Sequence, residues 1–182
     1  MGMPAILKAA GVPEFPVVRT EAGKRRFSSP AVEKAIARMQ QRIRDKELAW
    51  MFGNCFPNTL DTTVEPGTFE GKPDTAVITG DIAAMWLRDS SAQVWPYLPL
   101  AKADAALRGL LEGVIRRQAR CILLDPYANA FMADLSATPL EWSVKDKTDM
   151  KRGVGERNWD VDSLSYPIRL AHGYWKQTGD TA

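Results

Sequence analysis

The chain is organised around the stretch Thr79-Gly-Asp-Ile-Ala-Ala-Met-Trp-Leu-Arg-Asp-Ser-Ser-Ala-Gln-Val-Trp-Pro-Tyr-Leu-Pro99, which places charged and aromatic side chains among apolar ones. Charges that line a cleft are tolerated when they are paired or when a ligand uses them. Trp86, Arg88 and Asp89 therefore predict a pocket wall: an aromatic ring can stack on the C–H face of a sugar, and an Arg–Asp pair can bind hydroxyl groups. The alternative is a helix N-terminus capped by Asp89 or Ser90, with Arg88 on the surface.

The composition indicates one ordinary soluble domain. Of 182 residues, 45% are hydrophobic and 25% are charged, which is enough to bury a core. The net charge of +2, from 24 basic and 22 acidic residues, argues against a nucleic-acid or membrane-surface partner. The local basic cluster Lys24-Arg25-Arg26 is interpreted as a solvated linker, with a phosphate or nucleic-acid contact as the alternative.

Cysteine and histidine usage predicts no metal site, and no cofactor is expected. The chain has two cysteines, Cys55 and Cys121, no Cys-x-x-Cys pair and a single histidine, His172. We interpret the cysteines as small buried apolar residues of a reducing compartment, with one disulfide as the alternative, and His172 as a packing or surface residue. Lys8 and Pro13 interrupt the apolar start of the chain, and no run approaches a membrane span, which favours a cytoplasmic location.

The first third of the chain predicts an arm, a helix and a hairpin. Residues 1–27 have no periodicity and predict an irregular arm. Ser29 and Pro30 begin a helix that is expected to reach about Met51. Its inward face is expected to carry Val32, Ile36, Met39 and Ile43. Turn chemistry explains most of the polar segment 58–63, with Asp61 as an alternative ligand. Residues 65–74 predict a hairpin tip between short β-segments at 62–64 and 76–79.

Three further helices are expected. Residues 90–100 predict a helix despite Pro96, and residues 103–124 predict a core helix with a broad apolar stripe. On this core helix, Arg116, Arg117 and Arg120 are placed on or beside the outer face. Residues 156–177 predict a helix whose N-terminal end carries Glu156, Asp160 and Asp162, where the helix dipole alone explains acidic residues, and which ends at Gly179.

The connections between these helices hold the polar motifs. Asn129 lies in the turn at 125–131, where asparagine is more often a turn or capping residue than a ligand. Residues 133–155 form a long connection of a kind that is often functional. If the helices pair antiparallel, alternate connections meet at one end of the fold. A closed barrel of six helix pairs needs roughly 200 residues, so the sequence predicts the opening part of a larger domain.

Four motifs, in order, resemble glycoside hydrolase family 125. They are Asn58-Thr-Leu-Asp-Thr-Thr63, Thr79-Gly-Asp-Ile-Ala-Ala-Met-Trp-Leu-Arg-Asp-Ser90, Asp125-Pro-Tyr-Ala-Asn-Ala-Phe131 and Glu156-Arg-Asn-Trp-Asp-Val-Asp-Ser-Leu164. The resemblance implies a metal-independent exo-acting α-1,6-mannosidase with an (α/α)6 barrel. The expected fold is therefore mainly α, an incomplete (α/α)6 barrel with a small β-hairpin. Residues 1–27 would form the arm, and residues 28–182 would form the N-terminal part of the barrel.

The resemblance also implies the site residues. Arg88 and Asp89 are the first candidates for binding the hydroxyl groups of a terminal α-mannoside. Further candidates are Asp81, Trp86, Asn129 and Glu156. Where family members usually carry Lys, Glu, Ile and Cys, this chain has Asn158, Asp160, Val161 and Ser165, and the shorter Asp160 would shorten any contact made there.

The resemblance assigns catalysis to motifs that these residues lack. Family members invert the anomeric centre with a general acid in an Arg-Pro-Ser-Asp-Asp motif and a general base in a later His-Glu-Ser motif. Neither motif occurs among these 182 residues. Inversion needs two carboxylates about 6.5–9.5 Å apart. We therefore expect no catalytic residue in this chain and do not nominate Asp89 and Glu156 as that pair.

Three hypotheses follow from the sequence. The first is the N-terminal part of an inverting α-mannosidase, inactive in isolation, that supplies residues for an α-mannoside glycan. The second is a non-catalytic carbohydrate-binding module or pseudoenzyme on a half-barrel, which would need a partner or oligomer to cover its apolar faces. The third is a purely structural helical protein, which the Trp, Arg and Asp residues gathered at helix ends disfavour.

Overall fold

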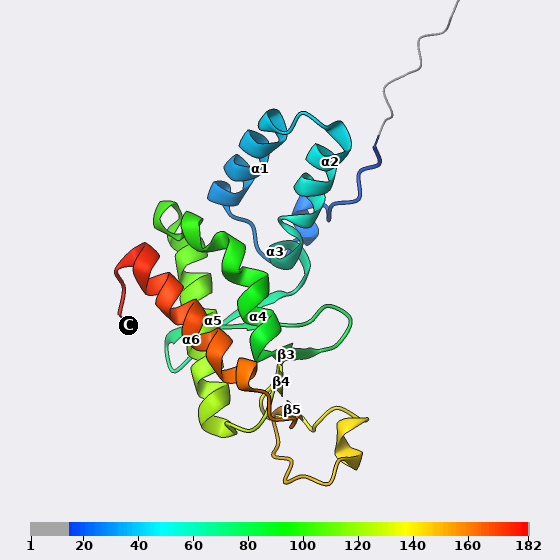
Figure 1. The fold of residues 1–182 in the computed structure, drawn as a ribbon, viewed down its shortest axis with the longest axis vertical. Coiled ribbons are helices and arrows are strands. Elements are labelled where there is room, and N and C mark those ends of the chain that lie inside the picture. Colours follow the sequence, from blue (N-terminus) through cyan, green and yellow to red (C-terminus); the bar gives the residue numbers. More distant parts are fainter. Residues whose placement is uncertain (1–14, 182) are drawn as a thin grey trace, which may run out of the picture.

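The computed structural model describes residues 15–181. Its main body consists of three neighbouring helices, with a smaller group of helices at one end and two small sheets (Figure 1). The helices of the main body are α4 (Leu87–Val94), α5 (Ala105–Leu124) and α6 (Val161–Thr178). A 3-10 segment, η2 (Trp95–Ala103), connects α4 to α5. The smaller group contains α1 (Pro30–Arg42), α2 (Lys46–Cys55) and α3 (Asn58–Thr62). Two shorter 3-10 turns are η1 (Ala22–Lys24) and η3 (Ser143–Lys145).

The helix predicted from Ser29 to about Met51 is two helices. Its start is as expected, since Ser29 Oγ accepts from Val32 N at 3.2 Å and Pro30 is the first helical residue. Ile43 leaves the helical conformation with φ −75° and ψ 117°. Asp45 then starts α2, because its side chain accepts a hydrogen bond from Leu48 N. The expectation of one continuous helix was wrong because an internal cap at Asp45 competes with propagation.

The predicted hairpin is present, with longer strands and a shorter tip. Strands β1 (Val64–Phe69) and β2 (Lys72–Val77) pair antiparallel, with Val64 opposite Val77 and Phe69 opposite Lys72. The tip is therefore Glu70-Gly71, and both residues have positive φ, 50° and 74°. A two-residue turn of this kind suits the twist of a hairpin. The predicted ten-residue tip was wrong because most of its residues join the ladder.

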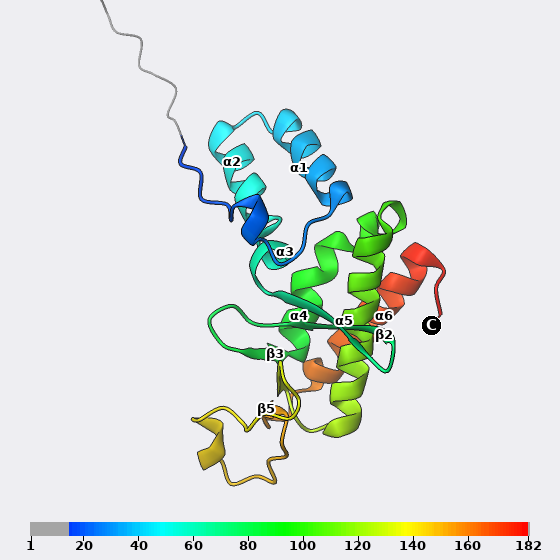
Figure 2. The same cartoon turned by 180° about the vertical axis from the view of Figure 1, so that it is seen from behind.

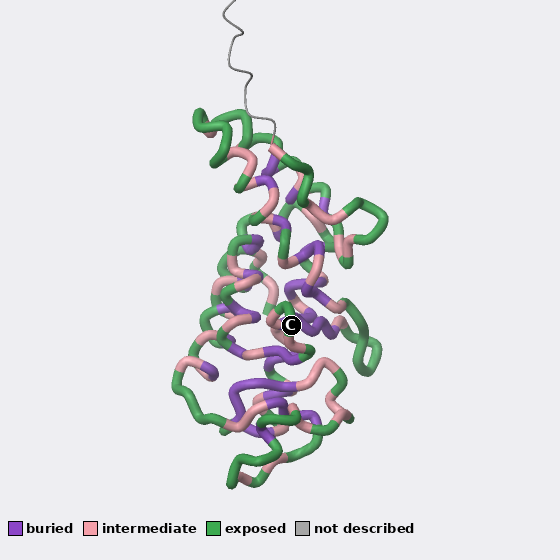
Figure 3. Tube along the Cα trace, turned by 90° about the vertical axis from the view of Figure 1, so that its right-hand side faces the viewer, coloured by how far each residue is buried: buried purple, intermediate pink, exposed green. Residues whose placement is uncertain are grey.

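The core lies where α5 packs against β2, η2, α4 and α6. In the view from behind (Figure 2), the hairpin crosses in front of α5. Figure 3 shows that buried residues run through the middle of this body. The contact with β2 is close, because a Cβ added at Gly113 would lie 2.5 Å from Thr75 Oγ1. The fully buried side chains of this core include Leu60, Val64, Val77, Met85, Tyr97, Leu107, Leu111 and Leu170.

One of the three arginines predicted on or beside the outer face of α5 is buried. Arg117 is only 6% exposed and donates from Nη1 to Asp74 Oδ2 at 2.7 Å. Arg120 Nη2 donates to the same oxygen at 2.9 Å, whereas Arg116 is half-buried and pairs with Glu112 on its own helix. The placement of Arg117 was wrong because β2 brings a buried carboxylate under α5.

A second sheet was not predicted. Strands β3 (Ala84–Trp86), β4 (Ala130–Met132) and β5 (Val154–Glu156) form an antiparallel sheet in the order β3-β4-β5. Each strand has only three residues, too few for a recognisable alternation. Of the two cysteines, Cys121 is buried as expected, but Cys55 is exposed, and both are free thiols. The prediction for Cys55 was wrong because it ends α2 on the solvent side.

Residues 15–27 of the predicted arm are held by ion pairs, and residues 1–14 lie outside the described residues. Arg19 Nε lies 2.7 Å from Asp61 Oδ2, and Arg19 Nη2 lies 2.6 Å from Glu33 Oε1. The cluster at 24–26, interpreted as a solvated linker, is paired as well: Lys24 with Glu21, Arg25 with Glu33, and Arg26 with Glu65. Asp61, considered above as an alternative ligand, is 3% exposed and pairs with Arg19 of the arm.

No helix in the part of the chain that the structure describes combines the length and apolar character required to cross a membrane.

Candidate functional site

The small sheet brings three of the four motifs together. Trp86 on β3 pairs with Ala130 on β4, and Ala130 pairs with Glu156 on β5. The backbone of Asn129 joins both neighbours, because its carbonyl accepts from Leu87 N at 3.0 Å and its N–H donates to Glu156 O at 3.2 Å. The sheet therefore lies at the N-terminal ends of α4 and α6, where both helices begin (Figure 1).

Glu156 is the centre of a side-chain cluster with Trp86 and Asn129. Its Oε2 accepts from Trp86 Nε1 at 3.2 Å and from Asn129 Nδ2 at 2.7 Å. Asn129 is 5% exposed, and its Oδ1 accepts from Asn158 N at 3.0 Å. Both the nitrogen and the oxygen of the Asn129 side-chain amide therefore form hydrogen bonds, and they connect the start of β4 to the end of β5 and to the residues that follow it.

The sequence predicted Glu156 at the N-terminal end of a helix, but the structure places it elsewhere. It ends β5, and α6 begins only at Val161. The helix dipole therefore does not account for this carboxylate. The sequence misplaced it because a three-residue strand before the helix carries no periodic signal.

Arg88 lies between two carboxylates at the start of α4. Its Nη1 donates to Asp162 Oδ2 at 3.1 Å, and its Nη2 donates to Asp89 Oδ2 at 3.2 Å. The hydrogen bond to Asp162, followed by the charge of Asp89, raises the pKa of the Arg88 guanidinium. All three side chains remain partly exposed. They therefore offer both donors and acceptors to a ligand in solution.

The capping alternative for this stretch does not describe the helix start. The residue preceding α4 is Trp86, and no side chain caps the helix there. Asp89 and Ser90 lie in its first turn. Ser90 is instead part of a buried support, in which Gln118 Nε2 donates to Ser90 Oγ and Ser91 Oγ, both at 2.8 Å.

Two further acidic residues, Asp81 and Asp162, differ in their contacts. Asp81 is exposed in the loop before β3, and within residues 15–181 its side chain forms no hydrogen bond or ion pair. Asp162 was not a predicted site residue, yet it is the α6 partner of Arg88, and within residues 15–181 its buried Oδ1 has no hydrogen-bond partner. The helix dipole alone explains an acidic residue in the first turn of a helix, so the sequence carried no signal for the pairing of Asp162 with Arg88.

The arrangement can bind hydroxyl groups. It combines one guanidinium, three carboxylates and an indole ring whose N–H is directed to Glu156. Nearby, Arg157 Nε pairs with the buried Asp125 Oδ2 at 2.7 Å and anchors the segment that leads from β5 to α6. Among residues 15–181, no group of three or more His, Cys, Asp or Glu residues is arranged to hold a metal ion.

Comparison with known proteins gives concordant results. The family model for metal-independent alpha-mannosidases (GH125) matches residues 45–182. The meiotically up-regulated gene 157 protein of Schizosaccharomyces pombe is 38% identical over 179 residues, which cover 94% of this chain and 35% of that protein. A metal-independent alpha mannosidase of Streptococcus pneumoniae, solved as a non-productive substrate complex with alpha-1,6-mannobiose, is 42% identical with a TM-score of 0.77.

The match to the solved enzyme covers 86% of this chain and 36% of that one, so the chain spans about a third of the length of both relatives. That enzyme is an α/α barrel, and this match confirms the predicted fold class, a partial α/α barrel that is mainly helical with a small hairpin. The family model covers most of the sequence, and its range includes all four motifs. The chain belongs to the metal-independent α-mannosidase family, glycoside hydrolase family 125.

Proposed function

We propose that this chain forms part of the substrate-binding wall of an inverting, exo-acting α-1,6-mannosidase that hydrolyses terminal α-mannosides. Family membership supports a glycoside hydrolase of the mannosidase kind. The Streptococcus pneumoniae relative was solved with alpha-1,6-mannobiose, which supports the linkage. In this proposal the ligand is a neutral sugar, recognised through its hydroxyl groups and one C–H face.

The observation that carries the proposal is the position of Arg88 between Asp89 and Asp162. A guanidinium has five N–H donors, and these two contacts leave some of them available. The neighbouring carboxylates supply acceptors, so adjacent hydroxyl groups could each find a donor or an acceptor. Trp86 lies two residues away, and its ring is oriented by the hydrogen bond to Glu156. An oriented indole can provide a stacking surface for the sugar.

The carboxylates of this site suit binding better than proton transfer. Asp89 and Asp162 both pair with Arg88, so their carboxylates orient the guanidinium. Inversion also needs one carboxyl group that protonates the leaving oxygen and a second that activates water. The family resemblance assigns these two roles to other motifs, and we therefore place the catalytic acid and base of the proposed reaction in the part of the family barrel that has no counterpart among these 182 residues.

Titration of the purified chain with α-1,6-mannobiose, followed by NMR, tests this function. We expect saturable binding with a dissociation constant of about 1 mM, and at least about tenfold weaker binding for Arg88→Met, since a charged hydrogen bond contributes about 1.5–3 kcal/mol. Arg116→Met, on α5 and away from the site, is the matched control. Absence of binding by the wild-type chain would contradict the proposed substrate wall.

An assay of released mannose tests the location of the acid and base. We expect no turnover by the purified chain, and hydrolysis would show that the catalytic groups are among these residues. The non-catalytic binding module makes a different prediction. It requires the sugar to be bound without hydrolysis even when the rest of a family barrel is supplied.

A further inference from the structure

The long connection between β4 and β5, residues 133–153, is docked against the strand that ends at Glu156. We call it the β4–β5 connection. The buried hydroxyl of Ser143 donates to Gly155 O at 2.6 Å, and Leu140 N donates to the same oxygen at 3.4 Å. Because Gly155 directly precedes Glu156, the turn η3 that begins at Ser143 lies against the strand that carries the carboxylate of the proposed site.

The residue after Glu156 holds the same connection. Arg157 Nη1 donates to Thr148 Oγ1 at 2.7 Å, while its Nε pairs with the buried Asp125. The β4–β5 connection is therefore fixed on both sides of Glu156. It lies at the end of the molecule where α4 and α6 begin (Figure 1). A connection fixed in this way can hold a side chain in one position against a ligand.

The β4–β5 connection presents an indole ring to solvent. Trp142 is 51% exposed, whereas Ser143, which follows it, is 1% exposed. The turn around them is closed by the backbone, since Ser143 N and Val144 N donate to Leu140 O at 2.9 Å and 3.2 Å. Trp142 is thus a large exposed ring on an ordered turn. Such a ring offers contact area to a ligand at a low cost in conformational entropy.

Exposed aromatic side chains gather at this end of the molecule. Of the five in residues 15–181, Tyr127 lies in the turn between α5 and β4, Trp142 in the β4–β5 connection, and Trp159 between β5 and α6. Tyr127 is also held in place, because the guanidinium carbon of Arg157 lies 5.4 Å from its ring centroid. Single exposed apolar residues are common on protein surfaces, but a group of them beside polar side chains is typical of an interaction surface.

The proposed reaction defines what this surface can bind. An exo-acting enzyme holds the terminal mannose in its site, so the next sugar of the glycan lies outside that site. In the proposed function, Arg88 and its two carboxylates bind the terminal mannose at the starts of α4 and α6. The β4–β5 connection borders the same end, and Trp142 can stack there on the apolar C–H face of a hexose.

We propose that Trp142 stacks on the second sugar of the bound glycan, the one next to the terminal mannose. The β4–β5 connection then sets a preference for an oligosaccharide over a single mannose. Trp142 lies outside the four motifs, so the family resemblance assigns no role to it. This inference rests on the proposed function, since it requires the terminal mannose to be held near Arg88.

Binding of methyl α-mannoside and of α-1,6-mannobiose tests the role of Trp142, because only the second ligand has a second sugar. Each ligand is titrated into the purified chain, and binding is followed by NMR. Trp142→Ala is the test variant, and Trp142→Phe keeps an aromatic face. Trp175→Ala is the matched control, since it removes another exposed indole. Circular dichroism verifies that all three variants are folded.

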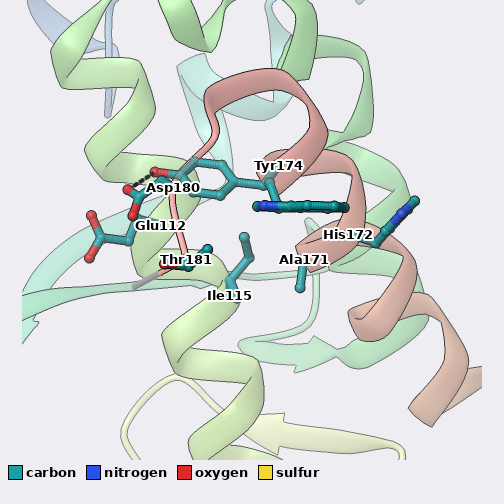
Figure 4. Close-up of a pocket in the computed structure, with 8 residues that line it drawn as sticks. Glu112, Ile115, Ala171, His172, Tyr174, Asp180 and Thr181 are labelled. Carbon is teal, nitrogen blue, oxygen red and sulfur yellow. Dashed lines mark hydrogen bonds between the residues drawn. The ribbon is translucent and has the colours of Figure 1, made fainter.

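Trp175 is a suitable control because it lies at the other end of α6. It is 45% exposed and lines a pocket of about 340 Å³ between α5 and α6. Figure 4 shows this pocket, in which Tyr174 donates to Asp180 beyond the end of the helix. The Arg88 site contacts α6 only in its first turn, through Asp162. The control therefore separates the loss of an exposed indole from the loss of Trp142.

The wild-type chain and Trp175→Ala are expected to bind α-1,6-mannobiose about 3- to 10-fold more tightly than methyl α-mannoside. Trp142→Ala is expected to lose this difference while its affinity for methyl α-mannoside is unchanged, and Trp142→Phe is expected to keep part of it. A difference that persists in Trp142→Ala, or that Trp175→Ala loses as well, would overturn the inference.

The wild-type chain separates this inference from the function on which it rests. Binding of methyl α-mannoside with no gain for α-1,6-mannobiose would overturn the role of Trp142 and leave the proposed function intact. Absence of binding of both sugars would refute the proposed function, and the role of Trp142 with it.

Discussion

Arg88 and Asp162 are 74 residues apart in the sequence, yet Arg88 Nη1 lies 3.1 Å from Asp162 Oδ2. The contact joins the first turn of α4 to the first turn of α6. Because Asp89 holds the other terminal nitrogen of Arg88 at 3.2 Å, the guanidinium plane is oriented by two helices. Preorganised donors lose less entropy when a ligand binds. This relationship therefore bears directly on the proposed affinity for sugars.

Replacing Asp162 by asparagine is expected to weaken mannobiose binding by about 3- to 10-fold, because the ion pair with Arg88 becomes a weaker hydrogen bond from the guanidinium to an uncharged amide oxygen. The measurement is the same NMR titration as for the wild-type chain. Asp160→Asn removes a charge just before the same helix, at a position where the side chain does not cap it, and is expected to have a smaller effect. Equal effects of the two variants would show that binding depends on the net charge near the start of α6, and not on the contact between Asp162 and Arg88.

Replacing Glu156 by alanine is expected to destabilise the chain by about 1–3 kcal/mol, since the side chains of Asn129 and Trp86 would both lose their acceptor. Urea unfolding measures this loss, and the indole N–H resonance of Trp86 reports the local change. Glu156→Gln keeps an acceptor oxygen and is expected to lose less. A Glu156→Ala chain as stable as the wild type would show that the cluster does not stabilise the small sheet.

Replacing Asp74 by alanine is expected to cost about 3–5 kcal/mol, because two arginines of α5 would lose their common carboxylate in a largely buried setting. Arg116→Ala is the control on the same helix. It removes a more exposed pair with Glu112, and the expected change is within about 0.5 kcal/mol. Denaturant unfolding compares the two, and similar losses would contradict the role assigned to burial.

Asp104 links the starts of two helices and predicts a pH effect. Its Oδ2 accepts from Ser29 Oγ at 2.6 Å, and its Oδ1 accepts from Ala106 N at 3.0 Å and Leu107 N at 3.1 Å. Burial alone would raise the pKa of Asp104, but these hydrogen bonds outweigh it and hold the pKa below its ordinary value of 3.8. The ionised side chain therefore stabilises the fold above pH 3.8, and this stabilisation is lost as the pH falls through the lower pKa of the folded state.

Asp104→Asn is accordingly expected to cost about 1 kcal/mol at pH 7, with a difference from the wild type that shrinks below pH 3.8. Thermal unfolding across this pH range measures it. Asp149→Asn, at an exposed loop position, is expected to leave stability unchanged at every pH. A difference for Asp104→Asn that persists undiminished at pH 2 would contradict the assignment to the charge.

Much of the local structure could be predicted because its causes lie within a few residues. Ser29 begins α1 through a hydrogen bond to Val32, and Gly179 ends α6 with φ 75°, which a glycine adopts easily. The apolar spacing of α5 predicted its core role, and Leu107 and Leu111 are fully buried. Four motifs sufficed to identify the family. The predicted helix boundaries were wrong where a capping residue lies inside an apolar helical pattern, as Asp45 does at the start of α2.

What the sequence determined by itself was therefore the family, the hairpin, the core role of α5, the start of α1 at Ser29 and the end of α6 at Gly179, since periodicity and capping act over one or two turns. The tertiary structure decided which polar groups meet: Arg117 with Asp74, Glu156 with Trp86 and Asn129, and Arg88 with Asp162. These contacts join groups far apart along the chain, and no local pattern encodes them. They form only when β2 packs under α5 and when three short strands bring the ends of α4 and α6 together.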